Sequence, residues 1–184
     1  AIATGMRQGE LLGLKWSDMD WGNQTLSVSR SLSQLKTGEY VFNPPKTKAG
    51  RRQIDLGSVS TEVLRTHHRN QYLESVSQPG WNAEDLIFPS KAGKPMDPGN
   101  LRRMYKNLLK SAGLPNIRFH DLRHTAATLM LNNGIPVLIV SRRLGHAKPS
   151  ITLDIYGHLI PGQQKIVASL MDELLTPIQL QLQN

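Results

Sequence analysis

The sequence contains no cysteine and no long hydrophobic run. Without cysteine, the chain can form neither a disulfide framework nor a thiolate zinc or iron–sulfur site, which fits a reducing compartment. No apolar stretch approaches the roughly 18 to 20 residues of a membrane helix, and no signal peptide opens the chain. We therefore expect a soluble protein, and its 184 residues are enough for one domain with a substantial core.

The chain also lacks an initiating methionine. It begins at Ala1, directly on an apolar run with helical spacing. We therefore expect residues 1–184 to be one domain of a longer protein, with an N-terminal part missing from this fragment.

Positive charge is concentrated in one part of the chain. The formal net charge is +8 and the pI is about 10.0. Residues 91–148 hold eleven Lys or Arg against Asp97 and Asp121, so this basic block exceeds the net charge of the whole chain. Such a block favours a polyanionic partner, most often nucleic acid, although a solvated basic surface has the same composition.

Hydrophobic periodicity predicts a mainly α fold with a small three-stranded antiparallel β-sheet. Helices are expected over residues 6–14, 60–77, 100–112, 120–132, 136–145, 149–156 and 163–175, and strands near residues 25–28, 40–42 and 52–56. Asn100 is the predicted N-cap of the third helix, and Pro177 is expected to end the last one. The predicted apolar stripe of the second helix consists of Val63, Leu64, Tyr72, Leu73 and Val76.

A basic loop joins the last two predicted strands. Residues 44–51 carry Lys46, Lys48 and Arg51 at its tip. This composition can serve solubility alone, but a hairpin of this kind can also reach into a DNA groove.

Two histidines on one predicted helix raise the question of a metal ion. His120 and His124 are four residues apart, which is a possible metal clamp. A metalloprotease helix would need Glu directly after the first His, where this chain has Asp121, and no third ligand is evident. We therefore expect no metal.

The same helix favours an anion. His120 and Arg123 are three residues apart, so both side chains can point the same way from its first turn, where backbone N–H groups also attract negative charge. Arg7 and Glu10 share a helix face in the same way, although alone they would be an ordinary surface ion pair. Taken together with a basic hairpin, these residues indicate a phosphate-binding pocket.

Five motifs occur in order along the chain: TGMRQGELLGLKWSDMDW, PPKTKAGRRQIDL, HDLRHTAATLML, LGH and IYGH. This ordered set resembles the catalytic domain of the tyrosine recombinases, specifically the phage-type integrases, and it covers essentially the whole chain. The resemblance implies the DNA breaking-rejoining fold of that domain. It also implies that a core-binding domain would precede Ala1.

The resemblance assigns catalytic roles by position. The matched catalytic residues are Arg7, Lys46, His120, Arg123, His146 and Tyr156, with Glu10 supporting the arginines. Lys48 is the competing choice for the hairpin lysine. None of these positions is substituted, which argues against an inactive relative.

The resemblance implies DNA cleavage by Tyr156 without metal or cofactor, through a covalent 3′-phosphotyrosyl intermediate that a second DNA end attacks. Arginine and histidine would stabilise charge on the phosphate, His120 would take the phenol proton, and Lys46 would protonate the leaving 5′ oxygen. DNA-backbone contacts are expected from Lys48, Arg51, Arg102, Arg103, Lys106, Arg142 and Arg143.

The same resemblance implies double-stranded DNA as the partner, a homotetramer on DNA, and accessory DNA-bending or directionality proteins. It also implies a cytoplasmic protein of bacterial or phage origin, encoded on a mobile genetic element. Two other functions remain open: a type IB topoisomerase-like enzyme, which shares the chemistry, and a non-catalytic DNA-binding regulator. The packing of the last helix, in its own subunit or on a neighbour, also stays open.

Overall fold

The computed structural model describes residues 1–159 and 164–175. Its α-helices are α1 (Gln8–Leu12), α2 (Ser58–Ser77), α3 (Pro98–Ser111), α4 (Asp121–Asn132), α5 (Val137–Leu144), α6 (Pro149–Tyr156) and α7 (Gln164–Leu175). Short 3-10 helices are η1 (Trp16–Asp18), η2 (Lys48–Gly50) and η3 (Gly157–Leu159). The strands are β1 (Met19–Asp20), β2 (Thr25–Val28), β3 (Ser31–Gln34), β4 (Tyr40–Asn43) and β5 (Arg52–Asp55).

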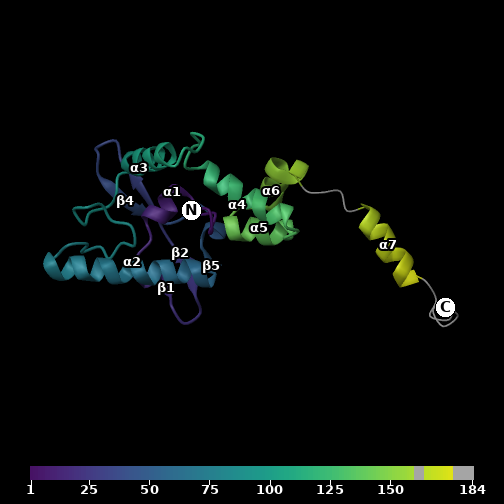
Figure 1. The fold of residues 1–184 in the computed structure, drawn as a ribbon, viewed down its shortest axis with the longest axis horizontal. Helices are drawn as coiled ribbons and strands as arrows, with labels where there is room; N and C mark the ends of the chain where they lie inside the picture. Colours follow the sequence, from purple (N-terminus) through teal and green to yellow (C-terminus); the bar gives the residue numbers. More distant parts are fainter. Residues whose placement is uncertain (160–163, 176–184) are drawn as a thin grey trace.

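The predicted fold class is confirmed, because the chain is mostly helical with a small antiparallel sheet (Figure 1). The membership of the sheet was predicted wrongly. The three-stranded sheet has the order β1-β2-β5, whereas β4 pairs with β3 in a separate hairpin. A two-residue strand such as β1 is too short to give an alternating pattern, so it could not be recognised from the sequence.

The apolar stripe predicted for α2 is wrong for four of its five residues. Val63, Tyr72, Leu73 and Val76 are all more than 60% exposed. The helix instead buries Gln71, whose Oε1 accepts a hydrogen bond from the indole N–H of Trp16 at 2.8 Å. Because the buried contact is polar, hydrophobic periodicity selected the wrong face.

The N-terminus of α3 also differs from the prediction. The N-cap is Asp97, whose carboxylate accepts a hydrogen bond from the backbone N–H of Asn100 at 2.8 Å. Pro98 occupies the first turn, where its missing N–H costs nothing. Asn100 is therefore not the N-cap, and its backbone N–H is the group that the cap residue Asp97 binds.

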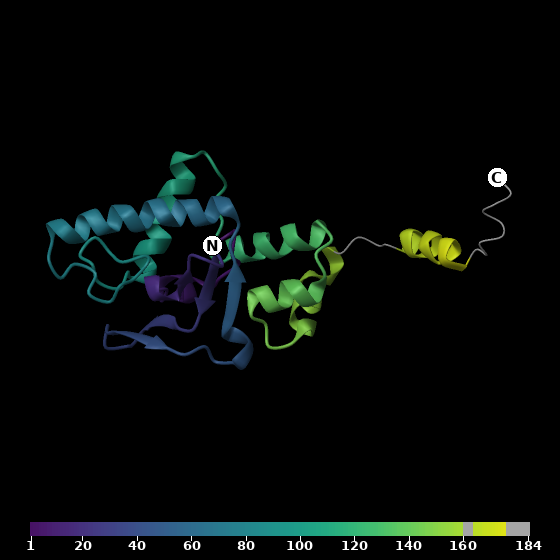
Figure 2. The same ribbon diagram turned by 90° about the horizontal axis from the view of Figure 1, so that it is seen from below.

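Two apolar clusters form the core. The first lies around the three-stranded sheet, where Leu26 and Ile54 stand opposite each other on β2 and β5. The second joins α4, α5 and α6 through Ala127, Leu131, Val140, Leu144 and Tyr156. Figures 1 and 2 show these three helices gathered beside β5. The candidate nucleophile therefore belongs to the second cluster.

The LGH motif forms the turn between α5 and α6. Gly145 ends α5 with φ 72°, in the left-handed region that a residue with a Cβ rarely adopts. A Cβ there would also lie 2.7 Å from Nη1 of Arg52. The glycine thus lets the turn approach β5 closely and positions His146 next to it.

Helix α7 lies apart from the other helices (Figures 1 and 2). Its predicted apolar positions are at least 46% exposed: Ile166, Val167, Leu170, Met171, Leu174 and Leu175. The predicted start at residue 163 and stop at Pro177 lie outside the described residues. Among the described helices, none combines the length and the apolar character that a bilayer crossing requires.

Candidate functional site

Glu10 links two arginines at the start of the first helix. The residue is 3% exposed, and its carboxylate accepts hydrogen bonds from Nη1 of Arg7 and Nη2 of Arg52, both at 2.9 Å. Burial would raise the pKa of Glu10, but the hydrogen bonds and charge of Arg52, with those of Arg7, hold that pKa below its usual value. Glu10 therefore stays ionised and fixes both guanidinium groups.

Arg123 is the most deeply buried cation of the site. Its residue is 4% exposed, and its Nη1 donates to the carbonyl of Gly5 at 2.6 Å. Its Nη2 is buried and has no hydrogen-bond partner among the described residues. Burial, followed by the charge of Arg7, lowers the pKa of Arg123 to about 10. A buried, charged donor without a partner is a site prepared for an anion.

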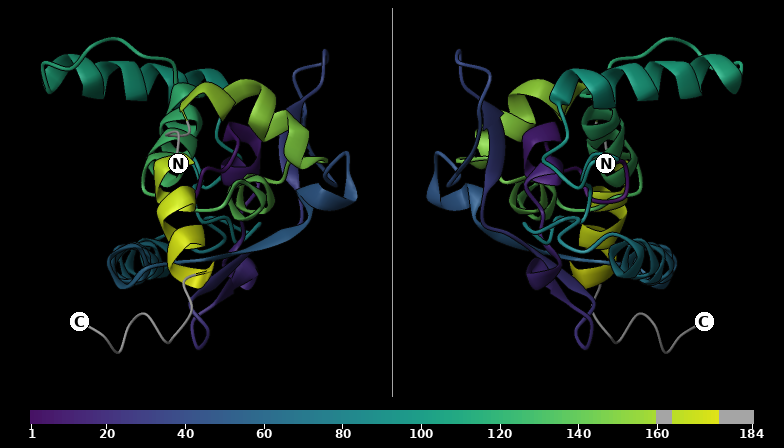
Figure 3. Two further views of the ribbon diagram at one scale, coloured as in Figure 1. Left: turned by 90° about the vertical axis from the view of Figure 1, so that its right-hand side faces the viewer. Right: turned by 90° about the vertical axis from the view of Figure 1, so that its left-hand side faces the viewer.

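A cavity of about 760 Å³ opens between the hairpin β3-β4 and the turn from α5 to α6. Arg7, Lys46 and His146 all line it. Figure 3, a view along the long axis, shows the hairpin and η2 on the side toward which α6 extends. The loop from β4 to η2 and the turn from α5 to α6 both line the cavity, so residues distant in sequence meet there. Lys48 is not in this lining within the described part of the chain, although both lysines are exposed.

The imidazole of His146 is held by the next helix. Its Nδ1 lies 2.8 Å from Oγ1 of Thr152, which is buried in α6. Burial, and then the charges of Arg123 and Arg7, lower the pKa of His146 to about 4. The ring is therefore neutral at pH 7, and Nε2, which Thr152 does not occupy, can form a hydrogen bond to a group in the cavity.

Tyr156 points its hydroxyl toward α4. The residue is 4% exposed, and its Oη lies 2.6 Å from Nδ1 of His124. Burial raises the pKa of the phenol, while the charge of Arg123 acts against this rise. The hydroxyl is therefore protonated at neutral pH.

The predicted proton acceptor, His120, contacts a different group. Its ring meets that of His124 edge to face, with centroids 5.0 Å apart, and the residue itself is exposed. Burial of the ring, followed by the nearby positive charges, lowers the pKa of His120. Sequence reasoning considered His124 only as half of a metal clamp and missed Arg52 entirely. In residues 1–159 and 164–175 no three His, Asp or Glu side chains are grouped as metal ligands.

The residues predicted to bind DNA are divided between two environments. Six are exposed: Lys48, Arg51, Arg102, Arg103, Lys106 and Arg142. Arg143 is half-buried, and its Nη2 donates to the carbonyls of Ala3 at 2.9 Å and Asp55 at 3.1 Å. Arg143 thus fastens α5 to the sheet in this structure.

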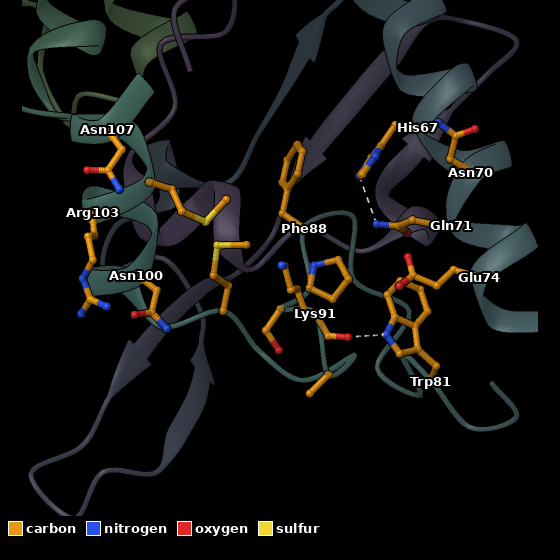
Figure 4. A pocket seen from close by; sticks show the side chains of 15 residues that line it. His67, Asn70, Gln71, Glu74, Trp81, Phe88, Lys91, Asn100, Arg103 and Asn107 are labelled. Atoms are coloured by element: carbon orange, nitrogen blue, oxygen red, sulfur yellow. Dashed lines mark hydrogen bonds between the residues drawn. The ribbon is translucent and has the colours of Figure 1, made fainter. Parts of the chain in front are cut away.

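A second cavity, of about 720 Å³, lies between α2, α3 and the loop that joins them (Figure 4). Trp81, Phe88 and Gln71 line it, together with Arg103. A hydrogen bond from the indole of Trp81 to the carbonyl of Lys91, 3.1 Å long, braces the loop. None of the six predicted catalytic residues lines this second cavity.

The model of the Phage integrase family matches residues 1–162. A tyrosine recombinase XerC-like protein of Caldanaerobacter subterraneus subsp. tengcongensis is 36% identical over 95% of this chain and 48% of its own length. The ICEBs1 integrase of Bacillus subtilis is 33% identical over 95% of this chain and 47% of its own. The chain thus spans about half the length of these curated relatives.

Solved structures agree with the fold. The Tn1549 transposon integrase superimposes with a TM-score of 0.76 at 24% identity, over 95% of this chain and 56% of the other. The XerA recombinase superimposes with a TM-score of 0.65 at 27% identity, over 92% of this chain and 55% of the other. By its match to the family model, the chain belongs to the phage integrase family.

Proposed function

We propose that the chain is the catalytic domain of a site-specific DNA recombinase of the integrase type. It cleaves a DNA strand with Tyr156, holds the 3′ phosphate as a phosphotyrosyl ester, and passes that end to a second DNA strand. The observation that carries the proposal is the unpartnered, buried Nη2 of Arg123, whose charge acts on the phenol of Tyr156.

Three cationic or donor groups suit the phosphate in this scheme. Arg123 and Arg7 donate to its non-bridging oxygens, and His146 adds a third donor from the cavity wall. A phosphodiester resists attack because it is negatively charged, so donors that are fixed before the reaction stabilise the extra charge of the transition state. Glu10 and Arg52 keep Arg7 in place, which makes them positioning residues.

The departing 5′ oxygen requires a proton. Lys46 is the proposed acid because it shares the cavity with Arg7 and His146. The sequence resemblance assigns the acceptance of the phenol proton to His120, and no contact between His120 and Tyr156 in the described residues supports that assignment. The ester conserves the energy of the phosphodiester, so a second DNA end can displace Tyr156 without any cofactor.

The whole protein is proposed to act on double-stranded DNA as a homotetramer in the cytoplasm of a bacterium, with accessory proteins that bend DNA or set direction. On the sequence resemblance, a core-binding domain would precede residue 1, and the chain spans only 48% and 47% of the length of two relatives. The exposed apolar positions of α7 offer a contact between subunits. Packing of α7 against its own subunit is the alternative.

The first test is covalent attachment in the full-length protein. A pool of duplexes, each nicked just beyond the cleavage position, traps the adduct because the short released strand diffuses away. We expect an SDS-resistant adduct in EDTA, with a phosphonucleotide on Tyr156 by mass spectrometry and none in Tyr156→Phe. The phenylalanine ring preserves the packing of the second cluster, so it is a matched control for folding.

The outcomes separate the candidate functions. An adduct followed by exchange of strands between two duplexes supports the recombinase. An adduct with relaxation of supercoils but no exchange would identify a topoisomerase-like enzyme instead. DNA binding without any adduct would leave a regulator and would contradict the proposal.

A further inference from the structure

Among the described residues, the hydroxyl of the proposed nucleophile makes one side-chain hydrogen bond, and its partner is not the predicted His120. Nδ1 of His124 lies 2.6 Å from Oη of Tyr156. Both residues are tied to their helices: Tyr156 is 4% exposed, and His124 follows the buried Arg123 directly on α4. The pair therefore forms at the contact between α4 and the end of α6, and no surface loop carries it.

The direction of this hydrogen bond depends on the tautomer of His124. Burial raises the pKa of Tyr156, so Oη carries a proton at neutral pH. In the tautomer with the ring hydrogen on Nε2, Nδ1 is unprotonated and accepts the phenol hydrogen across the 2.6 Å that separate Oη from Nδ1. This tautomer gives the imidazole one free lone pair, and that lone pair faces the phenol.

We propose that His124 is a catalytic residue that accepts the phenol proton of Tyr156 during strand cleavage. This inference rests on the proposed function. In the step, the Oη–H bond breaks, the proton moves to Nδ1, and the freed electron pair of Oη forms the bond to phosphorus. The bond from phosphorus to the 5′ oxygen breaks, and that oxygen takes a proton from Lys46. Rejoining reverses each transfer.

The surroundings favour His124 over His120 for this role. His120 meets the edge of the His124 ring at a centroid distance of 5.0 Å and is exposed. Its ring therefore orients His124, which makes it a positioning residue in this scheme. Arg123 is next in sequence to His124 and supplies the charge that stabilises the phenolate as it forms.

The test replaces His124 with Asn in the full-length protein. The side-chain oxygen of Asn can take the place of Nδ1 as hydrogen-bond acceptor, but it is too weak a base to keep a proton. We expect the rate of adduct formation to fall about 100-fold, within the usual range for loss of a general base. His120→Asn is the matched control, with a smaller loss. Thermal unfolding and DNA affinity should match those of the unsubstituted protein, and His124→Gln repeats the test should the Asn variant unfold.

A second measurement separates proton transfer from packing. Incorporation of 3,5-difluorotyrosine at position 156 makes the phenol more acidic, so that it ionises without a base. We expect this replacement to restore most of the rate lost in His124→Asn and little of any rate lost in His120→Asn. A purely structural role of His124 would not respond to the acidity of the phenol.

Each result decides the matter. The inference would be overturned if His124→Asn formed the adduct at a rate within about twofold of the unsubstituted protein, because loss of a general base should slow the step far more. A loss that the acidified phenol leaves unchanged would overturn it too. In both cases the Tyr156 adduct still forms in the unsubstituted protein and the proposed function stands. Absence of that adduct from the unsubstituted protein would overturn both.

Discussion

His146 stands at the turn between α5 and α6, where its imidazole is half-buried near Arg123, Arg7 and Arg52. Burial and these charges lower its pKa from 6.5 to about 4. Between those two values the unfolded chain binds a proton at this residue and the folded chain does not. Folding stability from this group is therefore complete above pH 6.5 and is lost as the pH falls toward 4.

This linkage predicts the behaviour of a substitution at His146. His146→Gln keeps a polar side chain of similar reach but cannot be protonated. We expect the free energy of unfolding, measured with urea at pH 7 and pH 5, to fall less with acid in this variant than in the unsubstituted protein. His158→Gln, at an exposed position on η3, should keep the unsubstituted pH dependence. Equal pH dependence in all three proteins would contradict the burial of a neutral His146.

The site could be predicted from sequence only in part. The motif positions identified Arg7, Lys46 and His146, and the structure gathers these three at one cavity. Arg52 was missed because its partner, Glu10, is 42 residues away, so that no local pattern connects them. His124 was paired only with His120, a neighbour that helical spacing predicts and the ring contact confirms, because its second contact, with Tyr156, comes from the packing of α4 on α6.

At the scale of elements, hydrophobic periodicity succeeded where a buried face is apolar and failed where it is polar. Helices α4 and α5 were found close to their bounds. On α2, the buried Gln71 supports the indole of Trp16, so the apolar positions were left on the surface. The strand that pairs with β2 could not be predicted from the sequence either. Both β4 and β5 have a suitable pattern, and only tertiary contacts decide between them.

The positions of Lys46 and Lys48 relative to η2 predict different effects of their substitution on strand cleavage. Lys46 precedes η2 and lines the cavity, whereas Lys48 is the first residue of η2 and lies outside that lining. We expect Lys46→Ala to slow adduct formation about 100-fold or more, as for loss of a general acid, and Lys48→Ala to change it only slightly. The two variants are matched in charge and exposure, so a difference reports position alone.

A substrate with sulfur in place of the 5′ bridging oxygen tests the role of Lys46. A thiolate leaves without a proton, so the rate of Lys46→Ala should recover on the sulfur substrate. The rate of His124→Asn should not recover, because its defect lies in the nucleophile. Equal effects of the two lysine variants, or a Lys46→Ala defect that sulfur does not relieve, would remove Lys46 from the role of acid.

At the scale of the whole molecule, the basic block of residues 91–148 runs through α3, α4 and α5. It holds eleven of the 22 Lys and Arg of the chain. Two members already have partners within the chain: Arg118 pairs with Asp121 at 2.9 Å, and Arg143 donates to the carbonyls of Ala3 and Asp55. The cations free to meet the DNA backbone are therefore fewer than the net charge suggests.

The number of cations that contact the DNA backbone can be measured from the salt dependence of DNA affinity. Each phosphate contact contributes a slope of about −0.9 to a plot of log affinity against log salt, so removing one should make the slope shallower by about 1. We expect this change for Arg102→Ala, Lys106→Ala and Arg142→Ala, which alter exposed positions on α3 and α5. Arg69→Ala, exposed on α2 and outside the block, is the matched control and should keep the full slope. An unchanged slope in the three variants would show that α3 and α5 do not contact the DNA backbone, and the basic block would then be a solvated surface.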